Sequence, residues 1–330
     1  MDNYKSFESL LYTVNEHNLD DIVLPLFRYQ AIHNPVYASY LKHLGTNLQN
    51  IKRVTDIPFL PISFFKKHMI KTGLWEDETY FTSSGTTGQS TSVHHIADLN
   101  FYLQHAERCF NYFFSKLTDY HFFALMPSYL ERENSSLIAM MNSFISKSGS
   151  EFSGFYLDDY EKLLKDINNA RKKRNKKIIL WGVSFALLDI AEKYQPDLNE
   201  CLVFETGGMK GRRKEIVRQD LHDRLKKGFH VERILSEYGM TELLSQAYSN
   251  GGNTFKAPPW MKMIVRDVAD PFEKGQIGRS GGINVIDLAN FRSISFIETE
   301  DSGTVFADGT FEVLGRIDNS DRRGCNLLVE

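Results

Sequence analysis

Apolar residues in the first part of the chain recur at intervals of three and four positions, which is the spacing of one helix face. The earliest are Phe7, Leu10, Leu11 and Val14. We therefore expect residues 1–50 to be helical, with a second helix beginning near Asp20. Residues 56–66 contain Pro58 and Pro61. Because a proline disfavours helix in the residue before it, we expect an extended connector there.

From residue 98 onward, predicted helices alternate with short apolar strands. The expected helices cover 98–117, 134–147, 159–176, 185–195 and 211–226, and the expected strands cover 121–126, 177–183 and 201–205. This alternation predicts a mostly parallel sheet with helices on both faces. The basic residues 171–174 end one of these helices, where the helix dipole favours positive charge, so we interpret them as a solvated helix end.

Beyond Pro258 the pattern changes to short strands between glycine-containing turns. These strands are expected over 261–267, 283–288, 293–298 and 310–314. We therefore predict an α/β core over 1–257, a small β-rich subdomain over 258–314 and a hinge-like tail over 315–330.

Composition adds few constraints. With 42% hydrophobic and 25% charged residues, the 330-residue chain has the composition of an ordinary globular protein. The net charge of −3 gives no reason to expect nucleic acid as a partner. The three cysteines are far apart, which argues against a disulfide framework and fits a reducing cytoplasm. No signal peptide and no apolar run of about 20 residues is visible, so we expect no integral membrane association.

A loop rich in glycine and hydroxyl residues follows the apolar run 79–81. Its residues are Ser83, Ser84, Gly85, Thr86, Thr87, Gly88 and Gln89. Glycines let backbone N–H groups approach a phosphate closely, and the hydroxyl groups add neutral donors. The loop lacks the lysine of a Walker P-loop, and by itself it is equally consistent with an ordinary surface loop.

Two further segments add chemistry that suits a nucleotide. Residues 205–209 include Gly207 and Gly208 and follow a predicted strand, at the edge where open α/β sheets bind ligands. Residues 236–242 supply a ring, a glycine, a hydroxyl and a carboxylate that suit purine stacking and metal binding. These four residues are Tyr238, Gly239, Thr241 and Glu242.

The C-terminal third holds two more candidates. Asp301 lies beside a predicted glycine turn over 298–303, where a carboxylate suits a ribose diol. The segment 315–318, which includes Arg316, follows the last predicted strand.

In this order, the segments resemble the motifs of the adenylate-forming superfamily of acyl-activating enzymes. The loop 83–89 is similar to its phosphate loop, residues 238–242 to its Y-G-x-T-E motif, and residues 315–318 to its hinge motif. Asp301 falls at the position of its ribose-binding aspartate. The resemblance covers residues 55–330 and implies an adenylation-type α/β fold. It also implies ATP and Mg²⁺ as cofactors, with Glu242 as the metal ligand.

A closer resemblance is to the acyl-protein synthetases, the bacterial luminescence fatty-acid activating subunit and its relatives. It rests on residues 61–66, 127–132, 135–137 and 323–328. In that family the acyl group passes from acyl-AMP to a cysteine near the C-terminus, which implies Cys325 as the acceptor. Arg322 and Arg323 precede this cysteine and favour its thiolate.

Two features depart from the superfamily pattern. Superfamily members continue for about a hundred residues past the hinge, in a lid domain that carries a catalytic lysine. This chain ends at Glu330, so we expect the lid domain and its lysine to be missing. Thr299 and Glu300 precede Asp301, where many relatives have Thr-Gly.

We therefore predict a cytoplasmic ligase that activates a carboxylic acid, expected to be a fatty acid, and transfers the acyl group to a protein thiol. The partners are the acid and an acyl-accepting reductase or carrier protein. The alternatives are an acyl-CoA ligase and a non-catalytic nucleotide-binding subunit. The candidate catalytic residues are Cys325, Glu242 and Thr86, and the candidate nucleotide-binding residues are Ser83, Ser84, Gly85, Thr86, Thr87, Gly88, Gly207, Gly208, Tyr238, Gly239, Thr241, Asp301 and Arg316.

Some side chains are left open or assigned other roles. His94 and His95 point to opposite faces of a strand, and one of them either reaches the acyl phosphate or has a structural or solvated role. Cys109 and Cys201 are expected to be inert core residues. The apolar residues Trp181, Phe185 and Phe204 are candidates for lining an acyl pocket.

Overall fold

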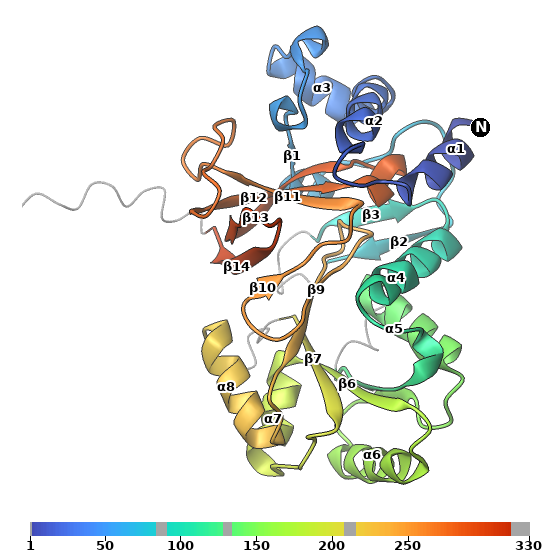
Figure 1. Cartoon of the computed structure of the whole chain (residues 1–330). Helices are drawn as coiled ribbons and strands as arrows, with labels where there is room; N and C mark the ends of the chain where they lie inside the picture. Colours follow the sequence, from blue (N-terminus) through green and yellow to red (C-terminus); the bar gives the residue numbers. More distant parts are fainter. Residues whose placement is uncertain (1, 84–90, 128–133, 208–215, 318–330) are drawn as a thin grey trace, which may run out of the picture.

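A computed structural model describes residues 2–83, 91–127, 134–207 and 216–317 (Figure 1). The α-helices are α1 (Asp2–Leu11), α2 (Leu19–His33), α3 (Pro35–His43), α4 (Leu99–Phe113), α5 (Ser136–Ser148), α6 (Tyr160–Lys173), α7 (Ser184–Lys193) and α8 (Arg218–Phe229). Short 3-10 helices are η1 (Leu48–Asn50), η2 (Val54–Asp56), η3 (Ile62–Lys66), η4 (Leu117–Asp119) and η5 (Leu288–Arg292). The strands are β1 (Leu60–Pro61), β2 (Thr79–Thr82), β3 (Val93–Ile96), β4 (Tyr120–Leu125), β5 (Gly154–Tyr156), β6 (Lys177–Val183), β7 (Cys201–Thr206), β8 (Leu235–Tyr238), β9 (Ala247–Ser249), β10 (Thr254–Phe255), β11 (Met261–Arg266), β12 (Ser280–Asp287), β13 (Phe296–Val305) and β14 (Phe311–Arg316).

The mostly parallel sheet has the strand order β5-β4-β6-β7-β8-β9, in which only β9 runs antiparallel to its neighbour. Helices α4 and α5 cover one face, where the rings of Phe110 and Phe144 each lie 6.3 Å from Trp181. Helix α7 covers the other face, and its Leu187 would lie 2.8 Å from a Cβ on Gly182. The predicted α/β sheet with helices on both faces is thus confirmed.

The antiparallel sheet has the order β10-β14-β13-β12-β11, with β1 added in parallel beside β13. In Figure 1 it occupies the upper half of the view, above the mostly parallel sheet. Buried side-chain amides of the N-terminal helical region form hydrogen bonds with the backbone beside this sheet. Gln30 of α2 donates to the carbonyl oxygens of Asn290 and Phe291, each at 3.2 Å, and the Asn34 amide donates to the Ser293 carbonyl at 2.9 Å.

The antiparallel sheet includes strands from both sides of the predicted domain boundaries. Strand β10 lies before residue 258 and yet pairs with β14, which itself continues to Arg316. Strand β1, from the predicted connector, pairs with β13. The division at 257 and 314 therefore stays a prediction of the sequence alone.

The structure corrects the predictions for the proline-containing connector and for the pocket candidates. The segment 56–66 is not wholly extended, because η3 begins directly after Pro61, and proline disfavours helix only in the residue before it. The pocket candidates Trp181 and Phe204 are fully buried and stack on each other at 4.5 Å, so they form core rather than a pocket wall. Phe185 is also buried, with 4% exposed. Within the described ranges, no helix combines the length and the hydropathy that crossing a membrane requires.

Candidate active site

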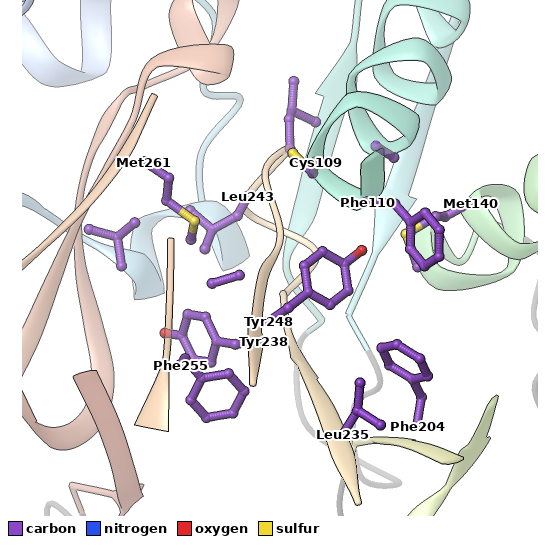
Figure 2. Packing of buried hydrophobic residues seen from close by; sticks show 14 of the residues in the cluster. Cys109, Phe110, Met140, Phe204, Leu235, Tyr238, Leu243, Tyr248, Phe255 and Met261 are labelled. Atoms are coloured by element: carbon purple, nitrogen blue, oxygen red, sulfur yellow. The ribbon is translucent and has the colours of Figure 1, made fainter. Parts of the chain in front are cut away.

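Tyr238 and Asp301 join the two sheets at the carboxyl edge of the mostly parallel one. Tyr238 ends β8, Asp301 lies in β13, and the tyrosine hydroxyl donates to Asp301 Oδ2 at 2.8 Å. Burial raises the pKa of Tyr238 well above its usual range, so the hydroxyl keeps its proton. The ring packs against Phe255 and Phe311, with ring centres 5.8 and 5.3 Å away. Figure 2 shows Tyr238 beside Phe255.

Asp301 lies inside a strand rather than beside a glycine turn, which corrects the prediction from residues 298–303. It pairs across the ladder with Arg316 of β14, and the register shifts between Ser302 and Gly303. A Cβ on Gly303 would lie 2.1 Å from the Glu312 carbonyl oxygen, so this glycine allows close strand approach rather than a turn. Burial raises the pKa of Asp301, while Tyr238 and Arg316 act in the opposite direction.

Glu242 is buried, with 5% of its surface exposed, and lies near Tyr238 and Arg316. Burial raises the pKa of its carboxyl, whereas a hydrogen bond with Ser92 and the charges of Arg316 and Lys66 lower it. Ser92 also donates its backbone N–H to Ser83 Oγ at 2.9 Å, and Ser83 donates its own to the Ser92 carbonyl at 3.1 Å. Ser83 and Ser92, which lie before and after the segment 84–90 in the chain, are therefore held together beside Glu242.

His94 fixes the turn that carries Glu242. Its Nδ1–H donates to the Thr241 carbonyl at 2.8 Å, and its Nε2 accepts from the Ser293 hydroxyl at 2.8 Å. Burial lowers the pKa of His94 to about 4, so the ring is neutral at pH 7. Of the two roles left open by the sequence, the structural role applies, because both ring nitrogens are engaged inside the protein.

The same turn is held from the antiparallel sheet by Asp287 and Asn290. Asp287 Oδ2 accepts from the Leu244 and Ser245 amides at 2.9 Å each, and its Oδ1 accepts from the Ser245 hydroxyl at 2.6 Å. Asn290 donates to the Glu242 carbonyl at 2.7 Å. Asp287 and Asn290 were not predicted from the sequence, since each acts on backbone far away along the chain and matches no motif.

The strand end 205–207 is anchored to the same edge. Gly207 has φ +73°, a conformation that glycine adopts without strain, and its carbonyl accepts from the Ser184 hydroxyl at 2.9 Å. Thr206 donates its hydroxyl to Glu237 Oε2 of β8 at 2.6 Å. Glu205 accepts from the Ser236 hydroxyl at 2.8 Å, and its pKa is lowered despite burial by His222, Arg218 and Ser236.

The structure thus brings together the described candidates of the predicted site: Ser83, Gly207, Tyr238, Gly239, Thr241, Glu242, Asp301 and Arg316. The other candidates lie outside the described residues: Ser84, Gly85, Thr86, Thr87, Gly88, Gly208 and Cys325. The nucleotide-binding and metal-binding roles of all these residues stay predictions. In the part of the chain that the structure describes, no three His, Cys, Asp or Glu side chains form a metal cluster of protein ligands alone.

The other two cysteines are not candidate nucleophiles. Cys109 is fully buried and Cys201 is 7% exposed. Burial raises the pKa of Cys109 to about 12 and that of Cys201 to about 11. The prediction that both are inert core residues is consistent with this burial.

No family model and no curated protein matches the chain. Several solved structures are similar to the chain. ATP-bound MatB from Rhodopseudomonas palustris is 18% identical with a TM-score of 0.53, and the alignment covers 72% of this chain and 47% of that one. A 2-hydroxyisobutyryl-CoA ligase in complex with 2-HIB-AMP and CoA is 14% identical with a TM-score of 0.66, covering 92% and 69%. The luciferase-like enzyme from the mealworm Zophobas morio is 17% identical with a TM-score of 0.50, covering 83% and 62%.

The chain spans about half the length of the MatB structures that it matches. Identities this low establish the fold and not the activity. These similarities agree with the fold that the motifs imply, and they do not single out the acyl-protein synthetases. The fold of the described residues is therefore the one found in adenylate-forming enzymes.

Proposed function

We propose that this chain activates a carboxylic acid with ATP, forming acyl-AMP and pyrophosphate. The observation that carries the proposal is the convergence of Tyr238, Asp301, Arg316 and Glu242 where the two sheets meet. Carboxyl edges of open α/β sheets are where such folds bind ligands. Solved structures with this fold hold ATP in one case and an acyl-AMP in another.

Asp301, Arg316 and Glu242 each have a chemical task in the proposed reaction. Asp301 offers a carboxylate to the ribose hydroxyls, and charge-assisted hydrogen bonds of this kind are strong. Arg316 and Lys66 supply positive charge near Glu242, which suits the phosphates. The Glu242 carboxylate and the Ser92 hydroxyl are hard oxygen donors of the type that Mg²⁺ prefers. A bound Mg²⁺ would offset phosphate charge.

For the second step we propose CoA as the thiol that accepts the acyl group. A similar structure, the 2-hydroxyisobutyryl-CoA ligase, is in complex with CoA. Transfer to a protein thiol, the sequence prediction, depends on Cys325, which lies outside the described residues. The CoA ligase alternative therefore has the better support.

The test is a pyrophosphate-release assay with ATP, Mg²⁺ and a panel of carboxylic acids. Release that depends on the acid is expected, and its absence with every acid would favour a non-catalytic nucleotide-binding subunit. Adding CoA to the active mixture should yield acyl-CoA.

A second assay decides the acceptor. In the absence of CoA, labelled acid should not stay on the denatured protein. If it does stay, and Cys325→Ser abolishes the label while leaving first-turnover pyrophosphate release intact, the acceptor is Cys325 and not CoA.

A further inference from the structure

The ladder between β8 and β9 separates two groups of polar side chains. Glu237 pairs directly with Tyr248, and Tyr238 with Ala247, so Glu237 and Tyr248 share one face. By the same alternation, Gln246 points to the face of Glu237 and away from the face of Tyr238. Figure 2 agrees, since the hydroxyl groups of Tyr238 and Tyr248 point to opposite sides. Tyr238 faces Asp301, whereas Glu237 lies on the face of Tyr248.

On that face, Glu237 and Gln246 converge over Gly239. A Cβ placed on Gly239 would lie 2.2 Å from Glu237 Oε1 and 3.5 Å from Gln246 Cγ. Gly239 itself is exposed and Glu237 is partly exposed. A side chain at position 239 would fill the space beside Glu237 Oε1.

The two side chains present acceptors without a matching donor. Gln246 is 4% exposed, and its amide N–H₂ donates to the Leu244 carbonyl at 3.0 Å. Among the described residues, its Oε1 has no hydrogen-bond partner. Glu237 receives the Thr206 hydroxyl on Oε2. Within the described residues no donor is recorded on its Oε1. Burial raises the pKa of Glu237 to about 7, as expected for a carboxyl with few donors.

Native proteins rarely leave a buried amide oxygen without a donor, so a ligand that supplies one fits here. We propose that Glu237 and Gln246 form a polar acyl subsite that selects carboxylic acids bearing an amino or hydroxyl donor on the carbon chain. The proposal rests on the proposed acyl-activating function. It replaces the apolar pocket expected from Trp181 and Phe204, which are core residues.

The test compares pyrophosphate release for pairs of acids in which a methyl group replaces the donor. Suitable pairs are 2-hydroxyisobutyrate and pivalate, 3-hydroxybutyrate and isovalerate, and 4-aminobutyrate and valerate. The wild type should prefer the donor acid of at least one pair by about tenfold or more in kcat/KM. Gln246→Met and Glu237→Met should each reduce that preference about tenfold or more while retaining activity on the methyl acid. Gln219→Met and Glu232→Met alter exposed side chains and should leave the preference unchanged.

The outcomes separate the two proposals. Pyrophosphate release that is equal or faster with every methyl acid overturns the subsite and leaves the proposed function intact. A preference for the donor acid that both variants preserve also overturns the subsite and leaves the proposed function intact. If either variant unfolds, the wild-type preference across the pairs still decides. No release with any acid overturns the proposed function and the subsite together.

Discussion

Glu242→Gln is expected to lower activity without lowering stability. The variant keeps the side-chain shape and an oxygen that accepts from Ser92, and it removes the negative charge. Losing an electrostatic contact that acts on the transition state costs about 100-fold or more in rate, which corresponds to roughly 2.7 kcal/mol. Because burial raises the pKa of this carboxyl, the anion is poorly solvated in the folded protein. The free energy of unfolding should therefore stay unchanged or rise.

The assay is pyrophosphate release at saturating ATP and increasing Mg²⁺, with urea unfolding measured in parallel. Glu232→Gln, at an exposed position, is the matched control and should retain the full rate. An unchanged rate for Glu242→Gln at saturating Mg²⁺ would remove Glu242 from the site. A rate loss that follows a loss of stability would assign the effect to folding.

Three further changes test the site and its supports. Asp301→Ala should weaken ATP binding well beyond tenfold in calorimetry, because charge-assisted hydrogen bonds contribute about 2–3 kcal/mol, and unaltered binding would place the ribose elsewhere. Asp287→Ala leaves the Ser245 and Ala289 amides without their acceptor and should lower the free energy of unfolding in urea by about 3–5 kcal/mol. A loss under 1 kcal/mol would show that the turn does not depend on Asp287. The folded-state pKa of His94, about 4, lies below its ordinary value, so the unfolded state binds more protons between about pH 6.5 and pH 4. Stability should fall as pH drops through this window, by up to about 1.4 kcal/mol per pH unit, and His94→Gln should flatten that slope if the assignment is right.

Local periodicity in the sequence predicted the type of the mostly parallel sheet and three of its six strands, but not the four-residue β8. The strands β4, β6 and β7 are continuous apolar runs, which are typical of strands buried on both faces, and the structure has them within one residue of the predicted bounds. The strands β5, β9 and β10 were missed, because two or three residues are too few to show a period. The residue types of the candidate site were also predictable, since a phosphate, a ribose and a metal ion each require particular donors and acceptors.

Only the tertiary structure decided which side chains meet. Tyr238 and Asp301 are 63 positions apart and join at 2.8 Å because the end of β8 meets the middle of β13 at the junction of two sheets. His94 lies 147 positions from Thr241, whose carbonyl it holds. The convergence of Glu237 and Gln246 over Gly239 depends on the register of one short ladder. A hydrogen bond depends on distance and direction in space, and neither has a period along the chain, so the sequence determined the chemical groups and the packing of the sheets determined their partners.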